Sequence, residues 1–427
     1  MMFDATSLRD TELFAEALFD KLREASVDPV RGGVCRDTYG QGEASAHALV
    51  REYALAMGLK VSEDHMLNTY MTWPGRSDSN KKIVIGSHLD SVPAGGNYDG
   101  AAGVVSGLGA IALLKQQGVV LEHDLVIMGI RAEESAWFSH SYIGSRGALG
   151  LLGPQALQKK RFDTGLTLEE HLRKAGGDPD AVRRQHVSLP VDDIIAFFEV
   201  HIEQAPTLAL DGHAMAIGTA IPGNVRYPAA QILGQYGHVG LPKRFRRDAA
   251  LAASDLFMRL DRVWQRHEDL GIPMAFTIGE FGTNPERHGL TTISGEFRFS
   301  LDLRAYEASR LQELETTFLA LVKAVEQEHQ VSVQLGPRAS AKPAVADPTL
   351  TEALRRSSHE LGLSCPDLLS PASHDAAAFD SAGVPFGFLF IRNPNGSHHP
   401  DEQMAVDDWL LATQTLARTL WRLDGLG

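Results

Sequence analysis

Cysteine and basic residues are scarce in this sequence, and each shortage excludes a class of protein. The 427 residues include two cysteines, Cys35 and Cys365, which form neither a Cys-x-x-Cys pair nor a disulfide framework. Lys and Arg total 40 against 54 Asp and Glu, so the formal net charge is −14. Because nucleic acids and anionic membranes require a basic surface, we expect neither as a partner.

Long hydrophobic runs are missing as well. The longest nearly apolar stretches, such as 104–114, are too short to span a bilayer. The N-terminus lacks the basic region and the apolar region of a secretion signal, so we expect a cytoplasmic protein in a reducing compartment. Hydrophobic residues make up 44% and charged residues 22%, which is an ordinary globular balance, and the length predicts one very large domain or two smaller ones.

Four short apolar runs lead into residues that carry chemistry. Continuous apolar runs of this length are typical of strands buried on both faces, and the helical stretch 101–116 between two of them indicates an α/β sheet. In such sheets, ligands bind beyond the carboxyl ends of the strands. The residues that follow the four runs are therefore predicted to form one site. The runs are 82–86 followed by His88 and Asp90, 125–130 followed by Glu133 and Glu134, 194–200 followed by His201, and 386–391 leading to His398.

The stretch from about 213 to 335 has a different pattern. Residues 296–304 alternate strictly between polar and apolar side chains, as a strand with one solvent-exposed face does, and amphipathic helices are predicted over 247–270 and 307–329. The order β-α-β-β-α-β fits a small ferredoxin-like α+β domain. The predicted division is a catalytic domain of residues 1–212 and 336–427 with an inserted domain of residues 213–335.

Each candidate residue also has a purely structural interpretation. Asp99 precedes the helix 101–116 and would be a good N-cap, the adjacent acids Glu133 and Glu134 suit a helix N-terminus, and a lone His is usually a core or edge residue. Their arrangement on one sheet edge favours the functional interpretation. Three imidazoles, a terminal carboxylate and a carboxylate able to bridge are the set that two divalent ions need, and this cysteine-free set favours Zn, Mn, Co or Ni.

These motifs, in this order, resemble those of the M20 metallopeptidase clan. The segment 201–204, with His rather than an acid as the ligand, is similar to the hydantoinase/carbamoylase branch, which includes N-carbamoyl-L-amino-acid hydrolases, allantoate and ureidoglycolate amidohydrolases and β-ureidopropionase. The resemblance extends from about residue 10 to residue 420. The motifs are His88-x-Asp90, Gly96-x-x-Asp99-Gly100, Glu133-Glu134, His201-Ile202-Glu203-Gln204 and Ser397-His398-x-Pro400-x-Glu402.

The resemblance implies a fold and a site. The fold would be a mostly parallel-sheet, phosphorylase/hydrolase-like metallohydrolase domain with an inserted ferredoxin-like dimerisation and lid domain, in a homodimer. Glu133 would be the general base and proton shuttle, and Asp90 would orient His88. The implied metal ligands are His88, Asp99 and His201 for one divalent ion and Asp99, Glu134 and His398 for the other.

Further implied roles fall on residues that contact the substrate. His238, in the insert, would stabilise the oxyanion in the partner subunit's site, and Gln204 and Arg304 match substrate-contacting positions. Arg304 would grip a carboxylate with its planar guanidinium.

The chain departs from the family at three segments near these positions. Thr291 occupies the place of an Asn that usually binds the substrate carboxylate, and the segment 241–245 replaces the usual Thr-Thr-Pro-Met. The third departure puts Trp137 after the acid pair, either as a pocket wall or, as we favour, as a core residue. These changes leave the metal ligands intact but alter the expected substrate contacts.

The leading prediction is a di-metal amidohydrolase that cleaves a linear C–N amide bond. Its expected substrate is a small molecule, an N-carbamoyl-L-amino acid or a related ureido acid. The alternative is a dipeptidase or N-acyl-amino-acid hydrolase of the same clan, against which His201 in place of an acid argues mildly. A metal-free binding protein is a third class, and the intact ligand set with Glu133 argues strongly against it.

Overall fold

The computed structural model describes residues 3–426 and divides into two compact units. The first unit is formed by the chain up to Thr219 and again from Val345, and the second is Ala220–Ala344. The second unit thus begins and ends somewhat later than the predicted 213–335. The difference arises because strand β6, Met215–Ile221, pairs with strand β17 in the sheet of the first unit.

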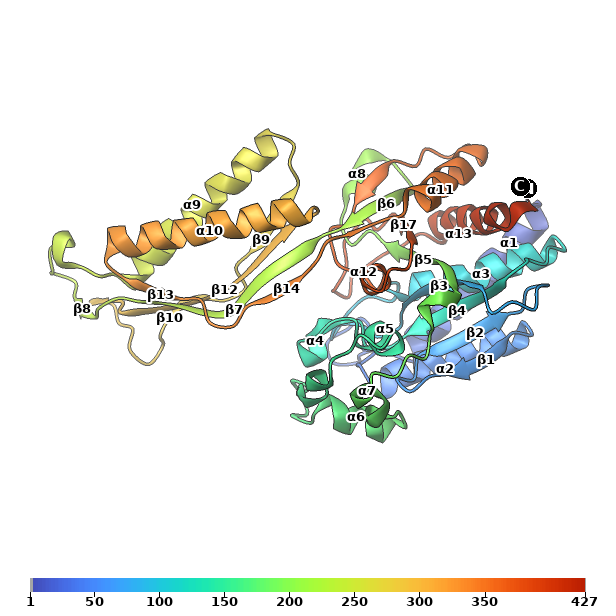
Figure 1. The fold of residues 1–427 in the computed structure, drawn as a ribbon, viewed down its shortest axis with the longest axis horizontal. Coiled ribbons are helices and arrows are strands. Elements are labelled where there is room, and N and C mark those ends of the chain that lie inside the picture. The colour runs from blue at the N-terminus through green and yellow to red at the C-terminus, as the bar shows by residue number, and fades with distance from the viewer. Residues whose placement is uncertain (1–2, 427) are drawn as a thin grey trace. The chain divides into compact units, whose positions relative to one another are not determined.

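The first unit is built on a nine-stranded sheet in the order β1-β2-β4-β3-β5-β17-β6-β15, with β16 paired to β6. The central strands β4, β3, β5 and β17 are parallel, and antiparallel pairs flank them, so the predicted mostly parallel α/β sheet is confirmed (Figure 1). Its strands are β1 Lys60–Glu63, β2 Thr69–Trp73, β3 Lys82–His88, β4 Asp124–Ile130, β5 Ile194–Ile202, β6 Met215–Ile221, β15 Ala344–Val345, β16 Asp367–Leu369 and β17 Phe386–Ile391.

Helix α3, Ala101–Gln116, fixes the depth of the site. It lies where the sequence predicted a helix, it is buried on nearly every side, and it packs on strands β3, β4 and β5 and on helices α1 and α13. Small residues allow this close packing: a Cβ on Gly103 would lie 2.2 Å from the carbonyl oxygen of Val200 in β5. The first turn of α3 is therefore held against the strand ends where the candidate residues lie.

The remaining helices of the first unit cover the sheet and its loops (Figure 1). Helix α1 begins at Ala5, where the Asp4 side chain accepts a hydrogen bond from the Ser7 amide as an N-cap. The helices are α1 Ala5–Glu24, α2 Gln41–Ala56, α4 Ser135–Phe138, α5 Ile143–Ala148, α6 Leu168–Ala175, α7 Pro179–Arg183, α8 Thr207–Asp211, α11 Pro348–Glu360, α12 Ala376–Ser381 and α13 Val406–Trp421.

The second unit has its own sheet and its own apolar core. Its main sheet has the order β10-β12-β7-β13, with β9 on β12 and β14 on β7, all antiparallel, and helices α9 and α10 lie on one face of it (Figure 1). Strand β12 alternates buried and more exposed residues, as predicted. The elements are β7 Gly223–Leu233, β8 Gly237–His238, α9 Ala249–Asp269, β9 Met274–Thr277, β10 Phe281–Thr283, β11 Thr292–Ile293, β12 Glu296–Ala305, α10 Ala308–His329, β13 Ser332–Gln334 and β14 Ala339–Ala341.

The two helices of the second unit follow the predicted pattern. Apolar residues recur every three or four positions along α9 and α10, and they are buried against the inner face of β7 and β12. Across residues 3–426, no helix is long and apolar enough to cross a lipid bilayer.

Candidate metal centre

Four neighbouring strands bring the candidate residues together at one edge of the sheet. His88 is the last residue of β3, His201 lies near the end of β5, and the acid pair Glu133-Glu134 follows β4. Because β4, β3, β5 and β17 are adjacent and parallel, their carboxyl ends meet at this edge. The loop before α3 adds Asp99, and the loop after β17 adds the sixth member of the cluster, His398.

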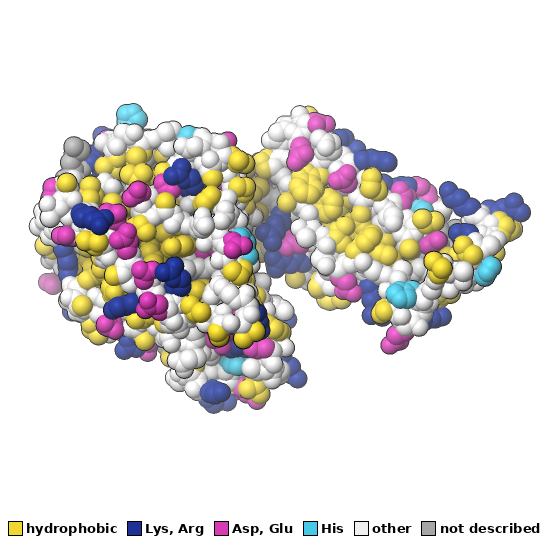
Figure 2. Space-filling model, turned by 180° about the vertical axis from the view of Figure 1, so that it is seen from behind, with side chains coloured by type: hydrophobic (Ala, Val, Ile, Leu, Met, Phe, Trp, Pro, Cys, Tyr) yellow, Lys and Arg dark blue, Asp and Glu magenta, His cyan; other side chains and the backbone are white. Residues whose placement is uncertain are grey.

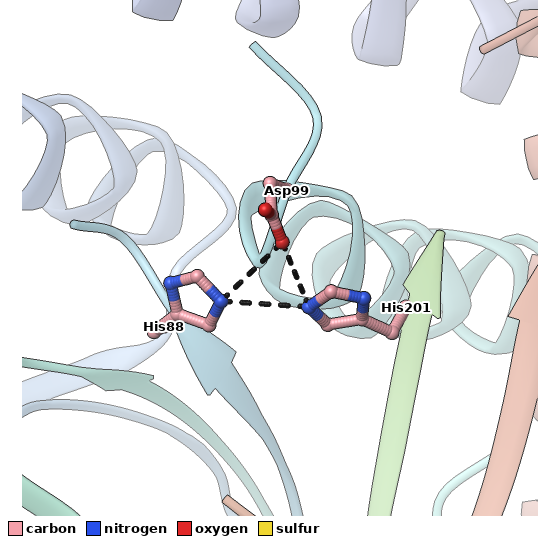
Figure 3. A group of neighbouring side chains, drawn as sticks. All are labelled: His88, Asp99 and His201. Atoms are coloured by element: carbon pink, nitrogen blue, oxygen red, sulfur yellow. Dashed lines mark hydrogen bonds and ion pairs between the residues drawn. The ribbon is translucent and has the colours of Figure 1, made fainter. Parts of the chain in front are cut away.

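One oxygen of Asp99 faces two imidazoles (Figure 3). The Nε2 atoms of His88 and His201 lie 3.6 and 3.1 Å from Asp99 Oδ1 and 3.4 Å from each other. All three side chains are buried. The three atoms converge on a common point, as the ligands of a single cation do.

The second oxygen of Asp99 faces a different pair of ligands. His398 Nε2 lies 3.2 Å from Asp99 Oδ2 and 3.4 Å from Glu134 Oε1. Asp99, Glu134 and His398 therefore form a second group that could hold an ion. Asp99 belongs to both groups, which is the arrangement that a bridging carboxylate requires. His88, Glu133 and Glu134 form a third such group.

The donor set fits divalent cations better than it fits internal hydrogen bonding. Among the described residues, the buried Asp99 Oδ1 has no hydrogen-bond partner, although two imidazole nitrogens lie nearby. A buried carboxylate oxygen without a partner is costly, and a cation at this position would satisfy it. Oxygen and nitrogen ligands in these numbers suit Zn, Mn, Co or Ni.

The balance of charge leads to the same requirement. Burial raises the pKa of Glu133 well above its usual value and raises the pKa of Glu134 and of Glu402 to about 7. Burial alone would also raise the pKa of Asp99, but its contacts with His201, His398 and His88 hold that pKa well below its usual value. Buried carboxyl groups are thus crowded at this site, and divalent cations would favour their ionised form.

The outer nitrogens of two imidazoles are held by backbone carbonyls. His88 Nδ1 lies 2.9 Å from the carbonyl oxygen of Asp90, and His201 Nδ1 lies 2.9 Å from the carbonyl oxygen of Ile202. Both rings therefore present Nε2 to the centre of the cluster. The nearer oxygen of the Asp90 carboxylate, the group predicted to orient His88, lies 3.5 Å from the same Nδ1.

The Asp90 carboxylate also fixes the acid pair. It accepts hydrogen bonds from the backbone amides of Glu133 (3.0 Å) and Glu134 (3.2 Å) and from the Thr38 hydroxyl (2.6 Å). The residue before the pair, Ala132, has a left-handed φ of 58°, which is costly for a residue with a side chain. The sharp turn after β4 is thus held by hydrogen bonds from outside the turn.

Gln204 and Ser397 lie at the rim of the cluster. Gln204 Nε2 donates to Asp99 Oδ2 at 3.0 Å, and the Ser397 hydroxyl lies 2.7 Å from the same oxygen. Gln204 was predicted as a substrate contact, and the structure brings it beside a candidate metal ligand. Ser397 was noticed only as part of the motif around His398.

Three further buried residues behind the cluster received no role from the sequence. The ring of His374 lies 4.4 Å from that of His201, measured between ring centres. Asp375 accepts a hydrogen bond from Ser145, and Glu199 accepts one from the Ala376 amide. Burial raises the pKa of Asp375 to about 7 and of Glu199 to about 8. Their positions follow from long-range packing, which local sequence patterns do not specify.

Trp137 has the core environment that we favoured. It is buried in an apolar cluster, its indole N–H donates to the Ser91 carbonyl oxygen at 2.7 Å, and the Arg161 guanidinium stacks 4.4 Å above its ring. Its side chain holds the acid-pair loop against the segment after β3.

His238 and Arg304 belong to the second unit. His238 is exposed on β8, where it lies opposite Thr292 of β11, and the Gly240 amide donates to its Nδ1 at 3.2 Å. In the neutral ring, Nε2 therefore carries the hydrogen. Arg304, in β12, is ion-paired with Asp302 at 3.2 Å.

Comparison with known proteins identifies relatives over nearly the whole chain. The sequence profile of peptidase family M20/M25/M40 matches residues 84–422. An N-carbamoyl-L-amino-acid amidohydrolase of Pseudomonas sp. (strain NS671) is 30% identical over 91% of this chain and 92% of its own length. An allantoate amidohydrolase of Bacillus subtilis (strain 168) is 27% identical over 93% of this chain and 94% of its own length.

A solved structure with the same fold is an amidase of the hydantoinase/carbamoylase family from Burkholderia multivorans. It has a TM-score of 0.83 and 25% sequence identity, and the match covers 100% of this chain and 98% of that one.

We predict that Asp99→Ala loses bound metal, because Asp99 is shared by two groups of ligands and its loss also leaves two cations unscreened from each other. Elemental analysis after loading with Zn²⁺ and dialysis would measure the stoichiometry. Asp401→Ala is the matched control, since Asp401 lies on the same loop as His398 and is exposed. Two retained ions in folded Asp99→Ala protein would contradict the shared role.

Proposed function

The chain belongs to peptidase family M20/M25/M40, and we propose that it is a di-metal amidohydrolase that cleaves a linear C–N bond of an N-carbamoyl-L-amino acid or a related ureido acid. The names of its relatives, which act on carbamoyl and ureido compounds, support this substrate class. The observation that carries the proposal is Asp99, whose two oxygens face separate ligand groups beside an acid pair.

The proposed ligands divide into two sets. His88, Asp99 and His201 would hold one divalent ion, and Asp99, Glu134 and His398 would hold the other. When bound, the ions would lower the pKa of the attacking water and polarise the carbonyl group of the substrate. The ligand types suit Zn, Mn, Co or Ni.

Glu133 is the proposed general base. It is buried, it lies next to the proposed ligand Glu134, and burial raises its pKa well above the usual value, so the carboxylate is a stronger base than an exposed one. Glu133 accepts the proton of the attacking water as the water oxygen bonds to the carbonyl carbon. As the C–N bond breaks, Glu133 delivers this proton to the departing nitrogen.

The remaining groups would bind the substrate and the oxyanion. His238 Nε2–H is a suitable donor to a developing oxyanion because the Gly240 amide occupies Nδ1. Arg304 would bind the substrate carboxylate, and Gln204 would contact the substrate from the rim of the cluster. Because Arg304 is already paired with Asp302, it would bind the substrate as part of that ion pair.

We further propose that the second unit is a ferredoxin-like dimerisation and lid domain that lends His238 to the site of a partner subunit. Its order of elements, β-α-β-β-α-β, supports this assignment. Exposed apolar side chains, visible in yellow on the right of Figure 2, also favour an interface. The large exposed apolar residues of this unit are Val239, Leu241, Phe245, Leu251, Met258, Leu270, Phe281, Leu290 and Leu319.

A substrate screen tests the proposed activity. After metal loading, we expect kcat/KM for N-carbamoyl-L-amino acids or ureido acids to exceed that for N-acetyl amino acids and dipeptides by about tenfold or more, since a site built to bind a ureido N–H rejects analogues that lack it. Chelator-treated protein is the control and should be inactive. A preference for dipeptides would instead favour the peptidase alternative.

We predict that Glu133→Gln keeps its metals but loses about 10²–10⁴-fold in kcat, because the amide cannot accept the proton. Metal analysis and steady-state kinetics together separate this loss from loss of the site. Activity within about threefold of the wild type would mean that the base and ligand roles are assigned wrongly.

The proposed action of His238 across a dimer predicts complementation. Glu133→Gln and His238→Ala proteins, each inactive, should form mixed dimers in which one site combines an intact Glu133 with an intact His238. About a quarter of wild-type activity should return if subunits mix randomly, because half of the dimers are mixed and each has one complete site. No recovery despite demonstrated subunit exchange would rule out action across the dimer.

A further inference from the structure

The loop that carries Asp99 is held by a buried arginine. Arg36 is fully buried, and its Nη2 donates to the carbonyl oxygens of Gly96 (3.2 Å) and Asn97 (2.7 Å). Its other two nitrogens, Nε and Nη1, have no hydrogen-bond partner within residues 3–426. A buried guanidinium with so few partners is costly, so its retention calls for a compensating interaction.

A buried acid, Glu402, holds the same loop through backbone amides rather than backbone carbonyls. Glu402 Oε1 accepts hydrogen bonds from the amides of Tyr98 (2.7 Å) and Asp99 (3.2 Å). Glycine at position 96 makes room for this carboxylate, because a Cβ there would lie 2.0 Å from the Glu402 carboxyl carbon. The loop 96–99 thus has a guanidinium on two of its carbonyls and a carboxyl oxygen on its next two amides.

This arrangement is electrostatically favourable. Each peptide unit has a partial negative charge on its oxygen and a partial positive charge on its amide hydrogen, so Arg36 and Glu402 stabilise the same orientation of the loop. Burial lowers the pKa of Arg36 to about 10, while Glu402, Asp99 and Asp90 oppose this shift. Arg36 therefore stays charged at neutral pH.

The segment around Arg36 is itself anchored to the stretch of chain that leads into the loop. Val34 and Gly95 exchange two backbone hydrogen bonds of 2.9 Å. The Ser91 amide donates to the Arg36 carbonyl oxygen at 3.0 Å, and the Arg36 amide donates to the Ser91 hydroxyl at 2.9 Å. The backbone that carries the Arg36 guanidinium is thus held in place.

Packing cannot replace these contacts on the outer side of the loop. Residues 95–98 line a cleft of about 880 Å³ together with Glu402 and Pro400. Because this side is open, hydrogen bonds must fix the loop and, through it, the Asp99 carboxylate.

We propose that Arg36 and Glu402 form a charge clamp on the loop 96–99 and that Arg36 is a positioning residue for the carboxylate shared by the two metal ions. The clamp rests on the metal site proposed above. It differs from a purely structural role, in which loss of Arg36 would lower the stability of the fold but leave metal affinity unchanged.

The test compares Zn²⁺ affinity with thermal stability in full-length protein. A chromophoric chelator competes for Zn²⁺, and the melting temperature is measured on the metal-free protein. Arg36→Met should lower Zn²⁺ affinity by about 10–100-fold, as loss of a residue that orients metal ligands typically does. Arg36→Lys keeps the charge but not the planar fork, so its loss should be smaller.

Arg418→Met is the matched control, because Arg418 is a buried arginine of α13 ion-paired with Glu360. It should lower the melting temperature while Zn²⁺ affinity stays within about threefold of the wild type. Glu402→Gln should weaken Zn²⁺ binding as Arg36→Met does. The double variant should lose less than the product of the two single losses, because both residues act on one loop.

Each outcome decides between the proposals. If the wild type binds no Zn²⁺, the proposed function fails and the clamp fails with it. If the wild type binds Zn²⁺ and folded Arg36→Met binds within about threefold of it, only the clamp is overturned. Should Arg36→Met not fold, Arg36→Lys and Glu402→Gln decide in its place, and wild-type affinity in both would overturn the clamp.

Discussion

Negative charge buried at the carboxyl ends of four parallel strands is the constraint on which the rest of the site depends. Asp90, Asp99, Glu133 and Glu134 are all buried within one cluster that offers three imidazoles, His88 among them, as local partners. Carboxylates this close together repel one another strongly where the dielectric constant is low. This concentration of carboxyl groups persists because backbone amides and hydroxyls donate hydrogen bonds to the carboxylates. The arrangement is also suited to divalent cations, which would supply positive charge.

The fold makes this concentration possible by dividing the task among rigid elements. The parallel strands fix where the chain emerges at the sheet edge, and the close packing of α3 on β5 anchors the end of the loop that leads into this helix. The candidate side chains lie at the ends of these strands or on short loops that are tied by hydrogen bonds. Asp90 is the clearest case: it follows β3, yet its carboxylate holds the turn after β4. One strand thus shapes the functional turn of its neighbour.

The sequence predicted the parts of the site that lie next to regular structure. His88, Glu133 and His201 follow or end apolar runs, so strand periodicity alone brings them to one edge. The hydrogen bonds between the Asp90 carboxylate and the amides of the acid pair were not predicted, because they depend on the direction of a turn that no local pattern specifies. Arg36 was missed for a related reason, since it lies in an irregular segment far in sequence from the loop it holds. The domain boundary shifted because β6 extends the first sheet beyond the expected insertion point.

The adjacent acids show why surroundings, rather than residue type, assign chemical roles. Glu133 and Glu134 have the same side chain and follow the same strand. Glu134 faces His398, whereas Glu133 is grouped with His88, and the charge of Asp375 contributes to the raised pKa of Glu133. Since Asp90 holds both backbone amides, the two side chains cannot exchange places without breaking those hydrogen bonds. In the function proposed above, this fixed turn allows one of two equivalent carboxylates to bind a cation and the other to move a proton.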